Sequence, residues 1–237
     1  FGCSPDEIAE TVVMSPFDDT LDALRDRSED VKEFKGFFRM INGTIKGKKY
    51  SYINSRIGSP MAADCTNYLS FTGCKDIIYV GLMGGLQPEV KVGDIIIPTG
   101  AYRGEGASKI FVEESYPASA NFHLTLELME SLEDVFHGSG TNIHDGVIYS
   151  TDSISMESEE FLRKCQERKM IAIDMETSAI YVVASLRNIR CTSVHIASDN
   201  PLEGLYYFEP MPDEDTERLE NSKKLIINAL VTFLQKH

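Results

Sequence analysis

Two acidic residues, Asp174 and Glu176, lie where a short apolar run meets a helical pattern. The run Ile171–Ile173 is typical of a buried strand, and Asp174 is a good N-cap for a helix that begins after it. Counting three, four and seven residues on from Glu176 reaches the apolar helix face that should point to the core (Ala179, Ile180 and Val183). A carboxylate at the head of that face either turns to solvent near the helix N-terminus or binds a dedicated partner.

A third carboxylate, Asp199, follows the apolar strand pattern Arg190–Ala197 and could, taken alone, be a turn or helix cap. The strand pattern Asp76–Val80 leads into the glycine segment Gly81–Gly85, which predicts a tight turn. This segment has neither the spacing of a dinucleotide fingerprint nor the Lys-Ser/Thr of a P-loop. In α/β folds, ligands bind beyond the carboxyl ends of strands. We therefore expect all three carboxylates and the glycine segment on one rim of a sheet.

Alternating helix and strand patterns must position these residues. Helical patterns cover Phe17–Phe34, Met61–Thr72, Asn121–Phe136, Ser158–Lys169, the residues after Asp174, and Asp213–Leu234. Strand patterns cover Gly36–Ile45, Lys48–Ile57, Asp76–Val80, Val92–Pro98, His144–Tyr149, Ile171–Ile173 and Arg190–Ala197. The first two strands read as a hairpin, and Pro98 reads as a strand end. No linker or repeat divides the chain, so residues 1–237 are expected to form one α/β domain, with a central twisted mixed sheet flanked by helices on both faces.

Composition argues against several classes of partner. The 237 residues contain 23 Lys and Arg against 37 Asp and Glu, a formal net charge of −14, which disfavours nucleic acid and anionic membranes. No apolar run is long enough to span a bilayer, and no signal-peptide pattern opens the chain. Five scattered cysteines show no metal-ligand spacing and suit reduced thiols. We therefore expect a cytoplasmic protein that binds no metal.

Several motifs together indicate a family. The residues Asp174-Met175-Glu176-Thr177-Ser178-Ala179 are similar to a Glu-Met-Glu-(Ala/Ser)-Ala signature, and Ala197-Ser198-Asp199 is similar to a Ser-Asp motif. Val80–Gly85 with Val92-Gly93-Asp94-Ile95 is similar to a central glycine segment, and Ile57–Pro60 to the loop before it. In these features the chain resembles the nucleoside phosphorylase family of hexameric bacterial purine nucleoside phosphorylase, uridine phosphorylase and the methylthioadenosine nucleosidases. The resemblance covers nearly the whole chain in order.

The resemblance implies cleavage of a nucleoside N-glycosidic bond through an oxocarbenium-like transition state. Glu176 would hold the ribose 2′- and 3′-hydroxyls, and Met175 would pack beside the sugar. Asp199 would protonate a purine leaving group, which requires a raised pKa. The base would lie against Asp174 and against Ile154, which stands where the family has a stacking aromatic residue.

The resemblance also implies a homo-oligomer, a dimer or a hexamer, in which a neighbouring subunit completes each site. No cofactor is implied, and phosphate would be a co-substrate in a pocket formed by Gly58, Gly81, Leu82 and Tyr79. The neighbour would donate a cation, Lys35 or Arg39.

The phosphate side of the site departs from the family pattern. Tyr79 and Leu82 stand where phosphorylases have an Arg and a Ser or Thr, and Cys3–Glu7 stands in place of a Gly-Asp-Pro…Arg motif. Losing a bidentate Arg–phosphate contact removes strong charge-assisted hydrogen bonds. These departures favour hydrolysis, whereas the frequency of phosphorylases within the family favours phosphorolysis, which is the first hypothesis. A hydrolytic nucleosidase and a catalytically weak nucleoside-binding protein are the alternatives.

Overall fold

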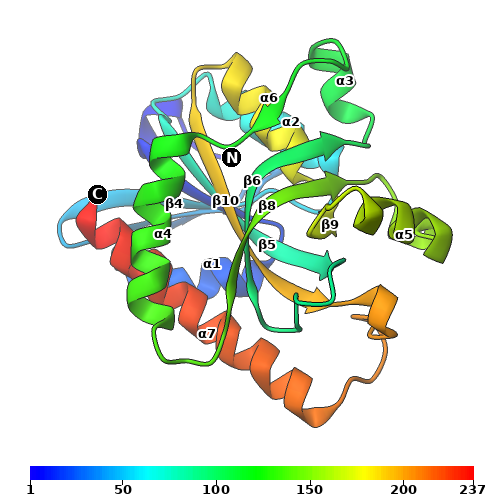
Figure 1. The fold of residues 1–237 in the computed structure, drawn as a ribbon. Helices are drawn as coiled ribbons and strands as arrows, with labels where there is room; N and C mark the ends of the chain where they lie inside the picture. Colours follow the sequence, from blue (N-terminus) through cyan, green and yellow to red (C-terminus); the bar gives the residue numbers. More distant parts are fainter.

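A ten-stranded mixed sheet organises the fold (Figure 1). The computed structural model describes all residues from 1 to 237. The strands are β1 Thr11–Ser15, β2 Glu29–Phe34, β3 Met40–Ile45, β4 Lys48–Asn54, β5 Asp76–Gly85, β6 Ile95–Arg103, β7 Ala118–Ser119, β8 Ile143–Ser150, β9 Ala172–Asp174 and β10 Arg190–Asp199. The helices are α1 Asp18–Arg25, α2 Ser59–Leu69, α3 Ala107–Phe111, α4 Phe122–Phe136, α5 Glu159–Glu167, α6 Thr177–Leu186 and α7 Asp213–Lys236. The expected mixed sheet is confirmed.

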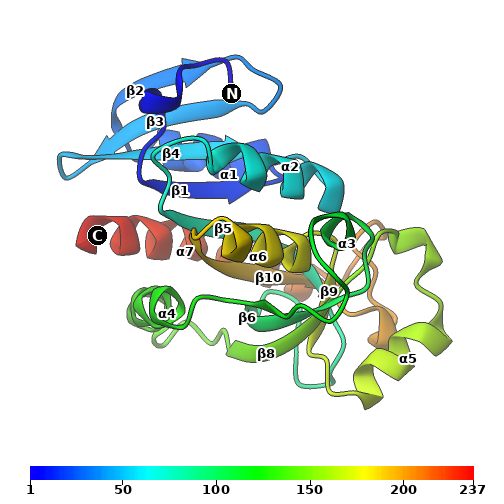
Figure 2. The ribbon, with the colours of Figure 1, turned by 90° about the horizontal axis from the view of Figure 1, so that it is seen from above.

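Strand β5 lies at the centre of the sheet. It pairs in parallel with β1 and β10 and antiparallel with β9. Strand β10 also pairs with β6, and β6 connects through β8 and β9 back to β5, so five strands form a closed ring of pairings. Four further strands extend from β1 through β4 and β3 to the edge strand β2 (Figure 2), and the short β7 pairs with β6.

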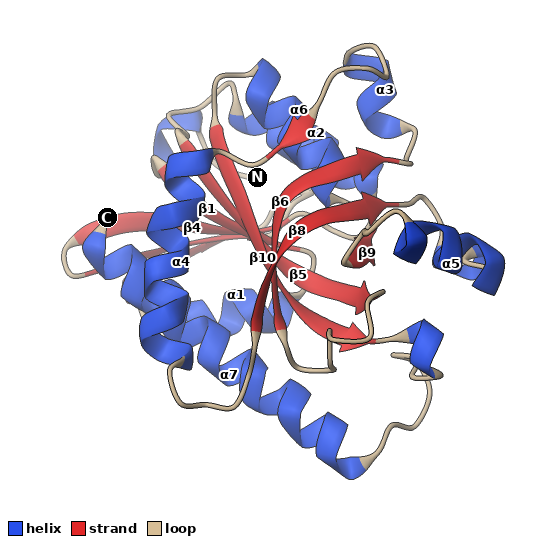
Figure 3. Ribbon diagram, viewed as in Figure 1, coloured by secondary structure: helices blue, strands red, loops and turns tan.

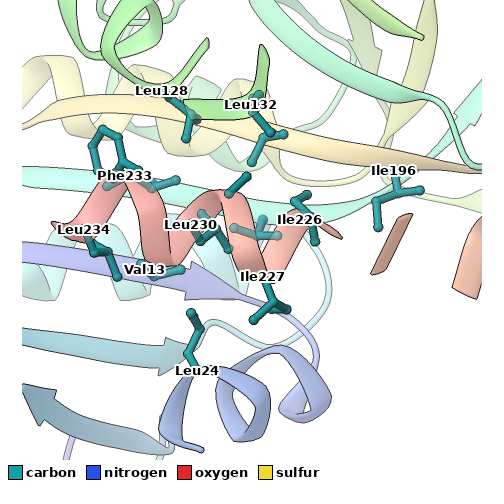
Figure 4. Close-up of a cluster of buried hydrophobic side chains, with 14 of the residues drawn as sticks. Val13, Leu24, Leu128, Leu132, Ile196, Ile226, Ile227, Leu230, Phe233 and Leu234 are labelled. Atoms are coloured by element: carbon teal, nitrogen blue, oxygen red, sulfur yellow. The ribbon is translucent and has the colours of Figure 1, made fainter. Parts of the chain in front are cut away.

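Helices cover both faces of the sheet, as expected (Figure 3). Buried apolar residues of α1, α4 and α7 pack with β-strand residues in one core cluster, part of which Figure 4 draws around Leu128, Ile226 and Phe233. Helices α2 and α6 pack on the other face in a second cluster that includes Leu69 and Ile180. Burial of these apolar stripes is the main force that holds the helices on the sheet.

The glycine segment Gly81–Gly85 does not form the expected turn, because β5 continues through Gly85. Residues of β10 and of the loop between β5 and β6 crowd it. A Cβ atom at Gly81 would lie 2.9 Å from Nδ1 of His195, and one at Gly85 would lie 2.9 Å from Cγ1 of Val90. Strand β6 likewise runs on past Pro98 instead of ending there, and its register with β8 shifts between Pro98 and Gly100. Proline is tolerated in a strand at such an irregularity.

The N-terminal part differs most from the sequence-based expectation. The predicted helix Phe17–Phe34 is wrong in its second half, because α1 ends at Arg25 and β2 follows. Strand β2 is almost entirely exposed and charged, so it lacks the apolar alternation by which half-buried strands are recognised. Strand β1 was not predicted at all. It is a short, buried parallel strand between β4 and β5.

Strand β10 contains an irregularity next to its end. Ala197 pairs with Met83, whereas Asp199 pairs with Gly84, so Ser198 is an extra residue opposite the β5 ladder. A bulge of this kind changes the direction in which the following side chain points. Asp199 accordingly lies on the same side as Gly84, where a Cβ atom would be 3.7 Å from its Oδ1.

Candidate active site

A cavity of about 280 Å³ lies at the rim of the sheet, on the side toward which the arrowheads of β5, β8 and β10 point in Figure 1. Its size is near the lower end of small-molecule sites, which range over about 300–1,000 Å³. The residues that line it are Pro16, Phe17, Ile57, Leu82, Met83, Gly84, Ile154, Glu157, Leu162, Ile173, Asp174, Met175, Glu176, Ser198, Asp199, Pro201, Tyr206, Tyr207 and Phe208. All three carboxylates singled out in the sequence therefore meet at one cavity, together with part of the glycine segment.

Glu176 is buried at the cavity wall instead of turning to bulk solvent. Its Oε1 accepts the backbone N–H of Gly58 at 2.6 Å, and only 7% of the residue is exposed. Gly58 lies in the loop between β4 and α2 at φ +98°, a conformation that L side chains rarely adopt. Burial, followed by the charge of Asp174, raises the pKa of Glu176 to about 8. With one oxygen bonded to the backbone, the carboxyl group can offer the other to ligand hydroxyls.

The N-cap residue of α6 is Glu176 and not Asp174 as predicted. Asp174 still binds the first turn of the helix. Its Oδ2 accepts the N–H of Thr177 at 2.8 Å, and its Oδ1 accepts the Ser150 hydroxyl at 2.6 Å. Burial raises the pKa of Asp174. Both oxygens are thus used within the protein, and the base-binding role that the resemblance implies for Asp174 stays a prediction.

Asp199 faces the cavity from the end of β10. The hydroxyl of Ser198 donates to its Oδ1 at 2.6 Å and fixes its orientation. Burial raises the pKa of Asp199, which favours the protonated form. An oriented carboxylic acid with a raised pKa is suited to donate a proton to a leaving group.

Glu157 is a cavity residue that the sequence reasoning missed as an individual site residue. It directly follows the 3-10 turn Ile154–Met156, and it lines the cavity together with Ile154. Burial, followed by the charge of Asp199, raises the pKa of Glu157 to about 7. Its position in a Ser- and Glu-rich segment, Ser153–Glu160, made it indistinguishable from a solvated surface charge.

The apolar walls also contain residues that were not predicted. Met175 and Ile154 line the cavity, as the resemblance implies for residues beside the sugar and the base. Four aromatic residues join them, Phe17 and the run Tyr206–Phe208. Three consecutive aromatic residues in a loop bounded by prolines are a sequence signal for a ligand-binding surface, and this signal could have identified them.

The residues expected to form the phosphate or water pocket do not all reach this cavity. Leu82 lines it, and Gly58 contacts Glu176, but Gly81 lines a neighbouring pocket between α1 and α7. Tyr79 is fully buried with its ring edge against His195, and its hydroxyl has no hydrogen-bond partner within normal geometry. Burial, and then the charges of Glu176 and Asp174, raise the pKa of Tyr79, so this hydroxyl stays neutral beside the acidic pair.

Cations are absent from the cavity wall, since none of its lining residues is Lys or Arg. Arg39 pairs with Asp18 at 3.1 Å and with Asp22 at 2.6 Å within its own chain, and Lys35 is exposed. The segment Cys3–Glu7 precedes β1, and Cys3 and Pro5 line a separate pocket. The part of the N-terminal region that does reach the cavity is Pro16–Phe17, directly after β1.

Other structural features bear on function. Asp152 joins two loops, because its oxygens accept the Ser59 hydroxyl and the Gly106 N–H, both at 2.9 Å. No group of three or more His, Cys, Asp or Glu side chains is arranged to hold a metal ion. None of the helices combines the length and the apolar character that a bilayer crossing requires.

Fold and cavity together define an α/β protein with a carboxylate-lined small-molecule site at the rim of its sheet. The chain belongs to the phosphorylase superfamily, whose family model matches residues 10–235. The resemblance found in the motifs is thereby confirmed.

Individual relatives agree with this assignment. The chain is 30% identical over 224 residues to a DeoD-type purine nucleoside phosphorylase of Roseobacter denitrificans, covering 92% of each chain. It is 27% identical over 219 residues to a guanosine phosphorylase of Halorubrum lacusprofundi, covering 91% of this chain and 89% of the relative. A crystal structure of uridine phosphorylase from Vibrio fischeri is similar with a TM-score of 0.82 at 25% identity, covering 98% of this chain and 95% of that one.

Proposed function

We propose that this protein cleaves the N-glycosidic bond of a nucleoside by phosphorolysis, releasing a free base and ribose 1-phosphate. The observation that carries the proposal is the cavity at which a backbone-anchored carboxyl group, Glu176, and an oriented acid, Asp199, both face the same space. Membership of the phosphorylase superfamily and similarity to relatives named phosphorylases support it.

Individual cavity residues have separate roles in this reaction. Glu176 accepts hydrogen bonds from the ribose 2′- and 3′-hydroxyls, and these bonds strengthen as positive charge develops on the sugar ring. Met175 packs against the sugar, and Ile154 packs against the base. Asp199 donates its proton to the leaving base, so that the base departs as a neutral molecule. Phosphate enters on the side of Gly58 and Leu82 and attacks the anomeric carbon as the bond to the base breaks.

Hydrolysis on the same scaffold is the second candidate, and a specific observation favours it. The cavity wall contains neither Lys nor Arg, and Tyr79 and Leu82 occupy positions where the resemblance implies phosphate ligands. Water is neutral and needs no cation to bind, whereas a phosphate dianion in an acidic cavity needs compensation.

A homo-oligomer would supply the missing cation for phosphorolysis. We propose a dimer or a hexamer in the cytoplasm, in which a neighbouring subunit donates Lys35 or Arg39 to the phosphate side. The ion pairs of Arg39 with Asp18 and Asp22 favour Lys35, because a charge that is already paired attracts phosphate less.

One assay separates the candidates. Purine and pyrimidine nucleosides are incubated with the protein in the presence and absence of phosphate, and the sugar product is identified. Ribose 1-phosphate formed only in phosphate supports phosphorolysis, whereas free ribose formed in phosphate-free buffer establishes hydrolysis. Binding of a nucleoside without any turnover would instead identify a binding protein.

A further inference from the structure

Tyr79 carries a buried hydroxyl group that has no partner. The residue lies on β5 and is fully buried, and no atom forms a hydrogen bond of normal geometry with its hydroxyl. Met14 on β1 and Ser193 on β10 flank it in the sheet, so the strands on both sides fix the position of the ring. Buried polar groups are almost always hydrogen-bonded, so an exception of this kind calls for an explanation.

The Tyr79 hydroxyl lies beside the carboxyl group of Glu176. Burial, and then the charges of Glu176 and Asp174, raise the pKa of Tyr79, and Ser55 and Glu176 also interact with its hydroxyl directly. Burial and then the charge of Asp174 raise the pKa of Glu176, whereas the N–H of Gly58 and the hydroxyl of Tyr79 lower it. Because an ionised carboxylate is a stronger acceptor than a neutral hydroxyl, Glu176 is the preferred partner of Tyr79 once it has lost its proton.

The carboxylate of Glu176 has enough acceptor sites for two protein donors and a sugar. An ionised carboxyl group offers about four lone-pair sites, two on each oxygen. The backbone N–H of Gly58 occupies one site on Oε1 at 2.6 Å. A hydrogen bond from Tyr79 to Oε2 would leave one free site on each oxygen, which matches the two adjacent hydroxyl donors of a ribose. Tyr79 itself does not line the cavity, so it acts on a ligand only through Glu176.

We propose that Tyr79 is a positioning residue for the ribose site. When a nucleoside binds, the Tyr79 hydroxyl donates to Oε2 of Glu176 while Gly58 donates to Oε1, and the two remaining acceptor sites face the 2′- and 3′-hydroxyls. This inference rests on the proposed function and adds a residue to its sugar site. It also assigns Tyr79 to the sugar instead of phosphate, which a buried phenol outside the cavity does not reach.

The substitution Tyr79→Phe separates stability from sugar binding. It removes an unpartnered hydroxyl and keeps the ring, so urea unfolding without ligand should show equal or higher stability than the wild-type protein. Calorimetry with two C-nucleosides, 9-deazainosine and pseudouridine, measures binding without a cleavable N-glycosidic bond. The affinity for the C-nucleoside that binds should fall about tenfold to a hundredfold, the usual effect of losing a hydrogen bond to a charged group. The corresponding bases alone, 9-deazahypoxanthine and uracil, lack the ribose and should bind both proteins equally.

Tyr52→Phe is the matched control. Tyr52 is also fully buried, but it lies on β4, and its hydroxyl is hydrogen-bonded to that of Ser28 at 2.8 Å. Loss of a satisfied hydrogen bond should lower the stability of this variant, and its affinity for the C-nucleoside should stay at the wild-type value. The two variants should therefore show opposite patterns.

The pH dependence of C-nucleoside affinity gives a readout that a purely structural role would not change. The ribose hydroxyls donate to the ionised form of Glu176, so affinity should rise with pH as this group loses its proton. Without the Tyr79 hydroxyl the ionised form is less stable, and the rise should move to higher pH in Tyr79→Phe. The other carboxyl groups at the site, Asp174, Glu157 and Asp199, are the same in both proteins, so the difference between the two profiles reports on Glu176.

Several results would overturn the inference. Unchanged C-nucleoside affinity in Tyr79→Phe, or equal losses for C-nucleoside and base, would show that the hydroxyl does not serve the sugar. A Tyr79→Phe protein that fails to fold would show that the hydroxyl already has a partner in the free protein. If the wild-type protein binds neither C-nucleoside, the ribose site itself is refuted.

The inference and the proposed function fail in different ways. A ribose-dependent loss of affinity in Tyr79→Phe, with no cleavage of any nucleoside by the wild-type protein, would refute the proposed function and support the role of Tyr79. Cleavage of a nucleoside by both proteins, with equal C-nucleoside affinities, would leave the proposed function standing and overturn the role of Tyr79.

Discussion

The backbone N–H of Gly58 donates to Oε1 of Glu176 at 2.6 Å, so a residue from the loop before α2 positions a carboxyl group at the start of α6. The two residues are 118 positions apart in the chain. Gly58 can hold this position because it adopts φ +98°. The geometry of the proposed ribose site therefore depends on a backbone conformation as much as on a side chain.

The substitution Gly58→Ala should impair sugar binding more than stability. An alanine at this φ is strained by roughly 1–3 kcal/mol, and relief of the strain would move the N–H away from Glu176. We expect kcat/KM for a nucleoside to fall about tenfold or more, mainly through KM, in steady-state assays. Gly47→Ala is the matched control, since Gly47 also has a positive φ, +76°, and open space where a Cβ atom would lie, but belongs to the β3–β4 hairpin away from the cavity. Equal losses of activity in both variants would show that the hydrogen bond to Glu176 is unimportant.

Asp199→Asn should remove the proposed proton donor. We expect cleavage of guanosine to slow by about 10²–10⁴-fold, which is the usual contribution of a general acid. The nucleoside 7-methylguanosine already carries positive charge on its base and needs no proton to leave, so its cleavage should slow far less. A rate comparison of the two substrates in both proteins tests the role. Similar losses for both would contradict acid catalysis by Asp199.

Glu176→Gln should stabilise the fold in alkaline solution. Burial, and then the charge of Asp174, raise the pKa of Glu176 from 4.5 to about 8, so the folded protein retains a proton that the unfolded chain releases. The free energy of unfolding should therefore fall as pH rises from 4.5 to about 8. Urea unfolding at pH 8.5 should show Glu176→Gln more stable than the wild-type protein by on the order of 2–4 kcal/mol, with a much smaller difference at pH 4.5. The same gain at both pH values would show that Glu176 is not protonated in the fold.

His195 should make the protein sensitive to acid. It is fully buried beside Tyr79, and burial lowers the pKa of His195 from 6.5 to about 3. The unfolded chain binds a proton at His195 that the folded protein does not bind. The free energy of unfolding therefore falls as pH falls from 6.5 toward 3. Between pH 7 and pH 5 this loss should be about 2 kcal/mol smaller in His195→Gln than in the wild-type protein. Denaturant titrations at the two pH values measure the loss in the free energy of unfolding. The control is the substitution of an exposed histidine, His137→Gln, which should show the same loss as the wild-type protein.

Residues that act locally could be predicted from the sequence. Asn121 and Ser158 were expected to begin helices, and their side chains accept the N–H groups of Leu124 and Phe161. The β3–β4 hairpin pairs as its turn residues indicated. The carboxylates Glu176 and Asp199 were found because the strand pattern before each of them is strong.

Features that depend on neighbours could not be predicted in this way. Gly81–Gly85 has the composition of a turn, but β5 is held straight by β10 on one side and β9 on the other. Glu157 lies among charged residues that face solvent, and only the cavity distinguishes it from Glu159. Such residues acquire their role through tertiary packing, on which local propensity carries no information.

The extra residue Ser198 in β10 determines on which face of the sheet the carboxyl group of Asp199 lies. Along an unbroken ladder Ala197 and Asp199 would point to the same side, whereas here Ala197 pairs with Met83 and Asp199 with the next residue, Gly84. If Ser198 joined the ladder as a regular residue, every residue of the proposed site would remain, but the carboxyl group of Asp199 would turn to the opposite face. The position of the proposed acid, Asp199, thus depends on the register of two strands as well as on residue identity. A substitution elsewhere in β5 or β10 that removes the Ser198 bulge would abolish the proposed activity while every cavity residue stays the same.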